Sequence, residues 1–202
     1  QGNWEEAGRS FDLALSLGKD YGPAYAGKAI VIAHAADNRT LPLSEREKAF
    51  ARADKVLDEA KSNAKNAEQE RDYHIARVRV YRLTKVNRYA DNADADYRKA
   101  VKLDARNLDA RPHFYMARTF RDAFRLQEAQ DLYRKVLGMN SPMTGRADAE
   151  LALVQRVIRA EPGSPYGKII AFDDSITRAD IAALFVEELR LDRLYQRGNA
   201  AQ

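Results

Sequence analysis

Residues 109–138 place large and small side chains at a spacing that predicts two short helices joined by a tight turn. In each half the pattern recurs at i, i+3, i+4 and i+7, which is one face of a helix with 3.6 residues per turn. The first set is His113, Met116, Ala117 and Phe120, and the second is Ala129, Leu132, Tyr133, Val136 and Leu137. Because Ala117 and Ala129 are small, the two backbones can approach closely. The stretch therefore predicts a helical hairpin that stacks on similar neighbours.

The second half of this hairpin has an earlier counterpart in the chain. Ala93, Tyr97 and Ala100 occupy the same relative positions as Ala129, Tyr133 and Val136, 36 residues later, and both tyrosines are followed by Arg-Lys. Further helical stripes precede them, beginning at Trp4, and Pro23 suits the first turn of a second helix. We therefore interpret the hairpin as one member of an array.

This pattern resembles the tetratricopeptide repeat, whose 34-residue unit has small residues at its eighth and twentieth positions. In residues 109–138 these positions are Ala117 and Ala129. The resemblance implies an all-α, right-handed solenoid of antiparallel helix pairs, with about three to four imperfect repeats. We expect the array to occupy residues 1–140, and a C-terminal extension of helices to occupy residues 141–202.

Several helix ends can be predicted from local residue types. Ser44 with Glu47 indicates a capping box, as does Thr177 with Asp180. A basic helix is expected at about residues 68–86, and the segment 168–172, KIIAF, reads as a short extended piece.

The segment 176–189, ITRADIAALFVEEL, resembles the end of an S-layer homology module. Modules of that family hold bacterial proteins to cell-wall polymers, so the resemblance implies a cell-envelope location, in the periplasm or at the wall. The same residues are equally explained as an ordinary helix start. A structural envelope protein is therefore the alternative to an interaction module.

Composition narrows the classes of function. The chain has no cysteine, which excludes thiol catalysis and thiolate metal sites. Its 34 basic and 30 acidic residues nearly balance, so attraction of the whole chain to nucleic acid is weak. The tyrosines fall at packing positions, and no nucleic-acid partner is expected. No run of about 18 apolar residues is present, so no transmembrane segment is expected either.

Motifs that carry chemistry are absent from the sequence. It contains no phosphate-binding glycine loop, no GxSxG and no HExxH. His34, His74 and His113 are far apart and are interpreted as packing residues, while the aspartates at 91, 94, 96, 173 and 174 read as helix caps and solvated turns. We expect a protein that is not an enzyme, with no catalytic residues, no cofactor and no metal.

One basic group remains as a candidate binding site. In the repeat family the first helix of each pair lines a concave groove, and the corresponding residues here are Arg111, Phe114, Arg118 and Arg121. Guanidiniums around a ring can hold carboxylates while the ring contacts an apolar side chain. Arg77 and Arg82 of the preceding basic helix are expected beside them. The competing interpretation is a solvated face paired with nearby Asp and Glu.

These residues predict a scaffold that binds a peptide or protein segment, in particular an acidic one. In addition, a repeat array that lacks its first helix exposes an apolar face. An absent helix before Trp4 would in this way favour homo-oligomers.

Overall fold

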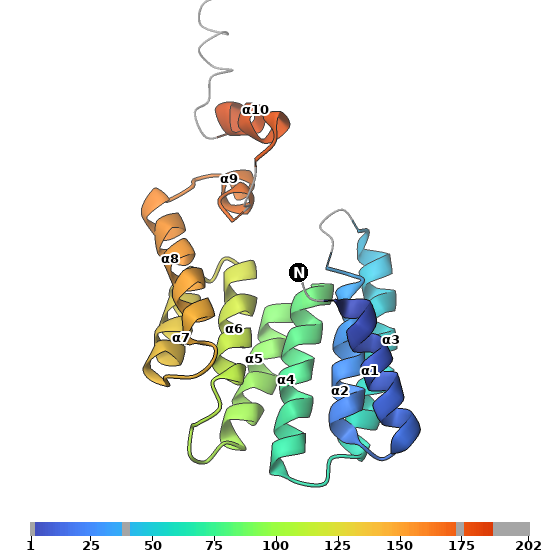
Figure 1. The fold of residues 1–202 in the computed structure, drawn as a ribbon. Coiled ribbons are helices and arrows are strands. Elements are labelled where there is room, and N and C mark those ends of the chain that lie inside the picture. The colour runs from blue at the N-terminus through green and yellow to red at the C-terminus, as the bar shows by residue number, and fades with distance from the viewer. Residues whose placement is uncertain (1–2, 38–40, 173–175, 188–202) are drawn as a thin grey trace, which may run out of the picture. The chain divides into compact units, whose positions relative to one another are not determined.

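The computed structural model describes residues 3–37, 41–172 and 176–187, and the regular secondary structure of these residues consists of helices (Figure 1). This confirms the all-α prediction for these residues. The helices are α1 (Trp4–Leu17), α2 (Gly22–His34), α3 (Leu43–Ser62), α4 (Ala67–Thr84), α5 (Tyr89–Lys102), α6 (Arg111–Asp122), α7 (Leu126–Gly138), α8 (Thr144–Ala160), α9 (Pro165–Ile170) and α10 (Arg178–Glu187).

The chain divides into two compact units, residues 1–148 and 149–202, with the division inside α8. The sequence had suggested a border at the connector that follows residue 140. In the second unit, α9 and α10 contact each other, and the Tyr166 hydroxyl donates a 2.8 Å hydrogen bond to Asp180 Oδ1.

In the first unit each helix packs against the next one along the chain from α1 to α7. In addition α2 contacts α4, and α4 contacts α6, although a whole helix separates each of these pairs in the sequence. These three helices therefore lie beside one another in one layer, and α3, α5 and α7 are their partners in the other (Figure 1).

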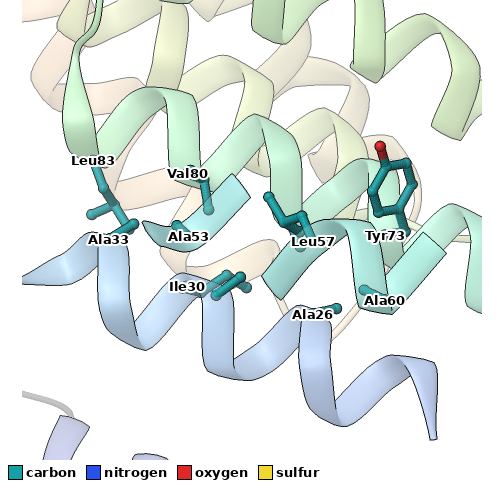
Figure 2. Packing of buried hydrophobic residues seen from close by; sticks show 11 residues of the cluster. Ala26, Ile30, Ala33, Ala53, Leu57, Ala60, Tyr73, Val80 and Leu83 are labelled. Carbon is teal, nitrogen blue, oxygen red and sulfur yellow. The ribbon is translucent and has the colours of Figure 1, made fainter. Parts of the chain in front are cut away.

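Small residues at the crossing points make this close packing possible. Figure 2 shows the core shared by α2, α3 and α4, in which alanines of α2 and α3 lie among larger side chains such as Leu57 and Leu83. Ala29, Ala53 and Ala76 have no exposed surface. Alanine at such points combines high helix propensity with a short distance between backbones. Most residues that repeat 36 positions apart are used in the same way in α5 and α7, where Ala93, Ala100, Ala129, Tyr133 and Val136 are fully buried. Tyr97 differs from its counterpart Tyr133, because it is only half-buried.

Asparagine side chains begin two of the helices. Asn3 accepts a 3.1 Å hydrogen bond from the Glu6 backbone N–H at the start of α1. The Asn66 side chain likewise accepts a 2.9 Å hydrogen bond from the Gln69 backbone N–H at the start of α4. Each side chain satisfies a backbone donor that the helix itself leaves without a partner.

The predicted capping box at Ser44 is wrong. Helix α3 begins at Leu43, with Pro42 as its cap residue and no side-chain capping bond. The backbone carbonyl of Pro42 instead accepts hydrogen bonds from Glu45 and Arg46, at 3.1 and 3.2 Å. Proline holds its own φ near the helical value, so the helix starts directly after it and Ser44 lies within the first turn.

Of the two structural predictions for the C-terminal part of the chain, one is wrong and one is confirmed. The prediction that 168–172 is extended is wrong, because α9 runs through most of it; Ser164 caps this helix by accepting 2.8 Å from the Gly167 N–H. The capping box at the start of α10 is confirmed. The Thr177 N–H donates to Asp180 Oδ2 at 2.7 Å, and the Asp180 N–H donates to Thr177 Oγ1 at 3.2 Å.

Candidate functional site

A hollow of about 860 Å³ lies in the first unit and is lined by residues of four helices and by the first turns of α8. For convenience we call it the arginine hollow. Its lining residues are Trp4 of α1, His34 of α2, Arg79, Arg82 and Leu83 of α4, Tyr115 and Arg118 of α6, Arg146 of α8, and Asp37. Positive side chains therefore predominate in it.

Helical spacing explains why these side chains share one space. On α4, Arg79 and Arg82 are three residues apart, and on α6 the same spacing separates Tyr115 and Arg118. Residues three apart lie on the same face of a helix. Since α4 and α6 pack side by side, their two faces form adjoining walls of the hollow.

Two of the arginines are held against aromatic rings. The guanidinium carbon of Arg79 lies 4.4 Å from the centre of the Tyr115 ring, and that of Arg146 lies 5.1 Å from the centre of the Phe114 ring. The rings belong to consecutive residues, with their centres 5.5 Å apart and their planes at 75°. A cation–π contact holds a guanidinium near a ring face while its N–H groups can still bind an oxyanion.

In the part of the chain that the structure describes, neither of these two arginines has an acidic partner. Within the described residues no carboxylate oxygen lies within 4.0 Å of the Arg79 or Arg146 nitrogens. Burial lowers the pKa of the Arg79 guanidinium, and three neighbouring positive charges lower it further. These charges belong to Arg82, Arg118 and Arg146. An anion in the hollow would relieve this repulsion.

Arg82 and Arg121 have a different environment, because both bind Asp122. Arg82 Nη1 donates to Asp122 Oδ2 at 2.8 Å, and Arg121 Nη2 donates to Asp122 Oδ1 at 2.7 Å. Burial alone would raise the pKa of the Asp122 carboxyl, but the two guanidiniums hold it below its usual range. Arg82 also lies 3.8 Å from Asp37. Both arginines therefore have an acidic partner within the protein, and they share the carboxylate of Asp122.

An aromatic pair forms another part of the lining. The Trp4 indole stacks on the His34 imidazole, with ring centres 4.0 Å apart. Burial lowers the pKa of His34, an effect that the nearby Asp37 carboxylate opposes. One face of the indole is covered by the imidazole, and one face of Tyr115 is covered by Arg79.

The structure separates the residues that the sequence had grouped into one binding face. Arg118 lines the arginine hollow, as does Arg82. Arg111 lies elsewhere: its guanidinium binds Asp109 at 2.7 Å and Asp72 at 2.9 Å. Arg111 thus fits the competing interpretation of a charged face paired with its neighbours.

Phe114 is fully buried, so the prediction that its ring is available to a partner is wrong. Its ring packs against Tyr133 of α7, with the ring centres 6.1 Å apart, and lies under the guanidinium of Arg146. A helix turns by about 100° per residue, and the face open to the hollow is that of Tyr115, one position further on.

Arg77 belongs to a second charged cluster, formed by α3, α4 and α5. Its guanidinium donates to Asp96 Oδ2 at 2.9 Å and to Asp54 Oδ1 at 3.0 Å, and His74 Nδ1 lies 2.7 Å from Asp96 Oδ1. Burial opposes ionisation of Asp96, but hydrogen bonds from His74 and Arg77 hold its pKa below the usual range. The reading of Asp96 as a cap or solvated turn is wrong, since its side chain joins α4 to α5.

The remaining sequence candidates for chemistry do not come together. Among the residues that the structure describes, no three histidine, aspartate or glutamate side chains gather as metal ligands would. The aspartates at 173 and 174 lie outside the described residues. None of the described helices combines the length and the apolar character needed to cross a bilayer.

Sequence reasoning missed Arg79, Tyr115 and Arg146 as lining residues. The Arg79–Arg82 spacing on one predicted helix was an available signal, whereas nothing in the sequence places Arg146 beside α6. Comparison of the chain with protein-family models, with curated proteins and with solved structures gave no match.

Proposed function

We propose that the protein is a non-catalytic interaction module that binds an acidic peptide segment in the arginine hollow. The proposal rests on one observation: Arg79 and Arg146 line this hollow without a carboxylate partner within the described residues. Positive charge that the protein does not pair with a carboxylate of its own is stabilised by an anionic ligand, most strongly at Arg79, where burial removes water from the guanidinium.

The arrangement of helices supports a binding scaffold. The layer α2, α4 and α6 with its partners α3, α5 and α7 is compatible with a right-handed, tetratricopeptide-like solenoid of helix pairs. In such an array the first helix of each pair lines the concave surface, and the hollow is lined mainly by α2, α4 and α6.

The size and lining of the hollow favour a short peptide. Its volume of about 860 Å³ lies within the range of ligand pockets, which hold molecules the size of a few residues. Apolar surface from Leu83, beside the Trp4 and His34 rings, would contact side chains next to the acidic group. An extended segment with one acidic residue and an apolar neighbour fits both features.

A peptide-display selection tests this function. Random heptapeptides selected on the immobilised protein should become enriched in acidic sequences, and their affinities can be measured by fluorescence polarisation. Arg79→Glu with Arg146→Glu should weaken binding at least about tenfold, because charge-assisted hydrogen bonds of about 1.5–3 kcal/mol each are lost.

The matched control is Arg98→Glu with Arg134→Glu. This pair makes the same charge change at exposed arginines on α5 and α7. It should leave binding within about twofold, as expected for surface charges away from a site. The proposal fails if no acidic sequence is enriched, or if both double variants weaken binding equally.

A structural role in the bacterial cell envelope is a second proposal. Its support is the segment resembling an S-layer homology module, whose Thr177–Asp180 capping box starts α10. Residues 188 and 189 of that segment lie outside the described residues.

A further inference from the structure

We infer that the arginine hollow prefers a phosphorylated peptide side chain to a carboxylate. This inference rests on the proposed function and specifies the chemical group that the hollow takes. The juxtaposition behind it is the pair of guanidiniums, Arg79 and Arg146, which lie over the adjacent rings of Tyr115 and Phe114.

Charge is the first argument. Two stacked arginines without a carboxylate partner in the described chain leave two positive charges to be balanced, and Arg118 adds to the field at Arg79. A carboxylate brings one negative charge, whereas a phosphate monoester at neutral pH brings between about 1.5 and 2. The phosphate therefore removes more of the repulsion among the arginines.

Geometry is the second argument. Each guanidinium presents planar N–H pairs that match the spacing of two phosphate oxygens, and a phosphate monoester has three terminal oxygens. Two arginines can therefore each bind a phosphate bidentately by sharing one oxygen. Since each guanidinium already lies on an aromatic ring, less side-chain freedom is lost on binding.

The surroundings favour a peptide over a nucleic acid as the carrier of the phosphate. Single-stranded nucleic acids gain much of their affinity by stacking bases on exposed aromatic faces. In the hollow the Trp4 indole is stacked on His34, and Tyr115 is covered by Arg79. Paired arginines such as Arg111 and Arg121 do not extend the positive charge into a long strip.

The test compares three peptide libraries with identical randomised flanks and a fixed central phosphoserine, glutamate or serine. Isothermal titration with the full chain should give at least about tenfold tighter binding to the phosphoserine library than to the glutamate library, and weakest binding to serine. Inorganic phosphate should compete only at far higher concentration than the phosphoserine library, because it lacks the flanking residues.

Variants assign the effect to the stacked pair. Arg146→Gln, at an exposed position, should reduce the preference for phosphoserine over glutamate about tenfold, and Arg79→Gln should do the same. Arg146→Lys keeps the positive charge but lacks the planar pair of N–H donors, so it should retain only part of the preference for phosphoserine. Arg134→Gln on α7 is the control and should leave the preference unchanged, with far-UV circular dichroism confirming that each variant is folded.

The outcomes distinguish this inference from the proposed function. Equal affinity for the phosphoserine and glutamate libraries, with both lost in the Arg79→Gln variant, overturns the phosphate preference and leaves the acidic-peptide function standing. Failure of both libraries to bind overturns both proposals. Binding of a single-stranded oligonucleotide or of inorganic phosphate as tightly as the phosphoserine library overturns the peptide as carrier.

Discussion

Arg77 and Arg79 are two positions apart on α4, yet their surroundings are opposite. Arg77 is bound by Asp96 and Asp54 from the neighbouring helices α5 and α3. Arg79 points into the arginine hollow and stacks on Tyr115. Side chains two positions apart on a helix point in directions that differ by about 200°, so two nearby arginines can have different surroundings. Their partners come from other helices, and a basic run in the sequence does not reveal them.

His113 is a buried polar residue whose hydrogen bonds suit a neutral ring. Its Nδ1 lies 2.9 Å from the Tyr97 hydroxyl, which can donate to it, and its Nε2 lies 3.2 Å from Asn107 Oδ1, which accepts. Burial lowers the pKa of His113 to about 4, and the charge of Lys135 adds to this effect. The interpretation of His113 as a packing residue agrees with its near-complete burial.

Stability should therefore fall as the pH is lowered from about 6.5 toward about 4. In this window the unfolded chain, with an ordinary histidine pKa, binds the proton and the folded chain does not. Between pH 7 and pH 5 the loss from His113 should be about 2 kcal/mol. Urea unfolding followed by circular dichroism at both pH values measures it.

The control is His113→Gln, which has no titrating group at this position. The variant is expected to be less stable at pH 7 but to lose about 2 kcal/mol less than the wild type on going to pH 5. The same pH dependence in both proteins would contradict the assignment to His113.

At the scale of the helices, the contact between α1 and α2 depends on glycine. A Cβ atom added at Gly27 of α2 would overlap the Phe11 ring of α1, whereas one at Gly8 of α1 would meet Val31 at an ordinary 3.5 Å. Both glycines lie within helices, where alanine is normally better by about 1 kcal/mol. The two positions thus share a helix pair but differ in available space.

Gly27→Ala should destabilise the protein by about 1–2 kcal/mol, because overlap with Phe11 outweighs the gain in helix propensity. Gly8→Ala should stabilise it by about 0.5–1 kcal/mol. Thermal melts monitored by circular dichroism would give both values. A change of the same sign in the two variants would show that packing at Gly27 does not control this contact.

Helix positions were the most predictable part of the fold. Periodicity located α6 and α7 within residues 109–138, and the pattern that recurs at a spacing of 36 residues located α5. The wrong predictions lie where another residue nearby determines the helix start. Ser44 lost its capping role to the preceding Pro42, and the apolar letters of 168–172 became part of α9 because Ser164 caps a helix start.

At the scale of the whole molecule, the envelope proposal leads to a localisation experiment. Ile181 and Phe185 of α10 are partly exposed apolar residues that could contact another envelope component. In its native cells the protein should fractionate with the envelope, and Ile181→Ser with Phe185→Ser should lower that share. Immunoblots of the separated fractions measure it.

Leu13→Ser provides the control, since Leu13 is an exposed apolar residue of α1 in the other unit. This variant should fractionate like the wild type. Recovery of the native protein in the cytosol alone would rule out the envelope proposal.

The amino-acid sequence by itself determined that the chain is helical, where most helices lie, and that small residues allow them to pack closely. These properties follow from local spacing, because a helix repeats every 3.6 residues whatever surrounds it. The tertiary structure alone decided which arginines pair with aspartates and which lie over aromatic rings. Arg111 and Arg121 meet aspartates, while Arg79 and Arg146 meet aromatic rings. That outcome depends on helix rotation and on partners distant in sequence, which no local pattern specifies.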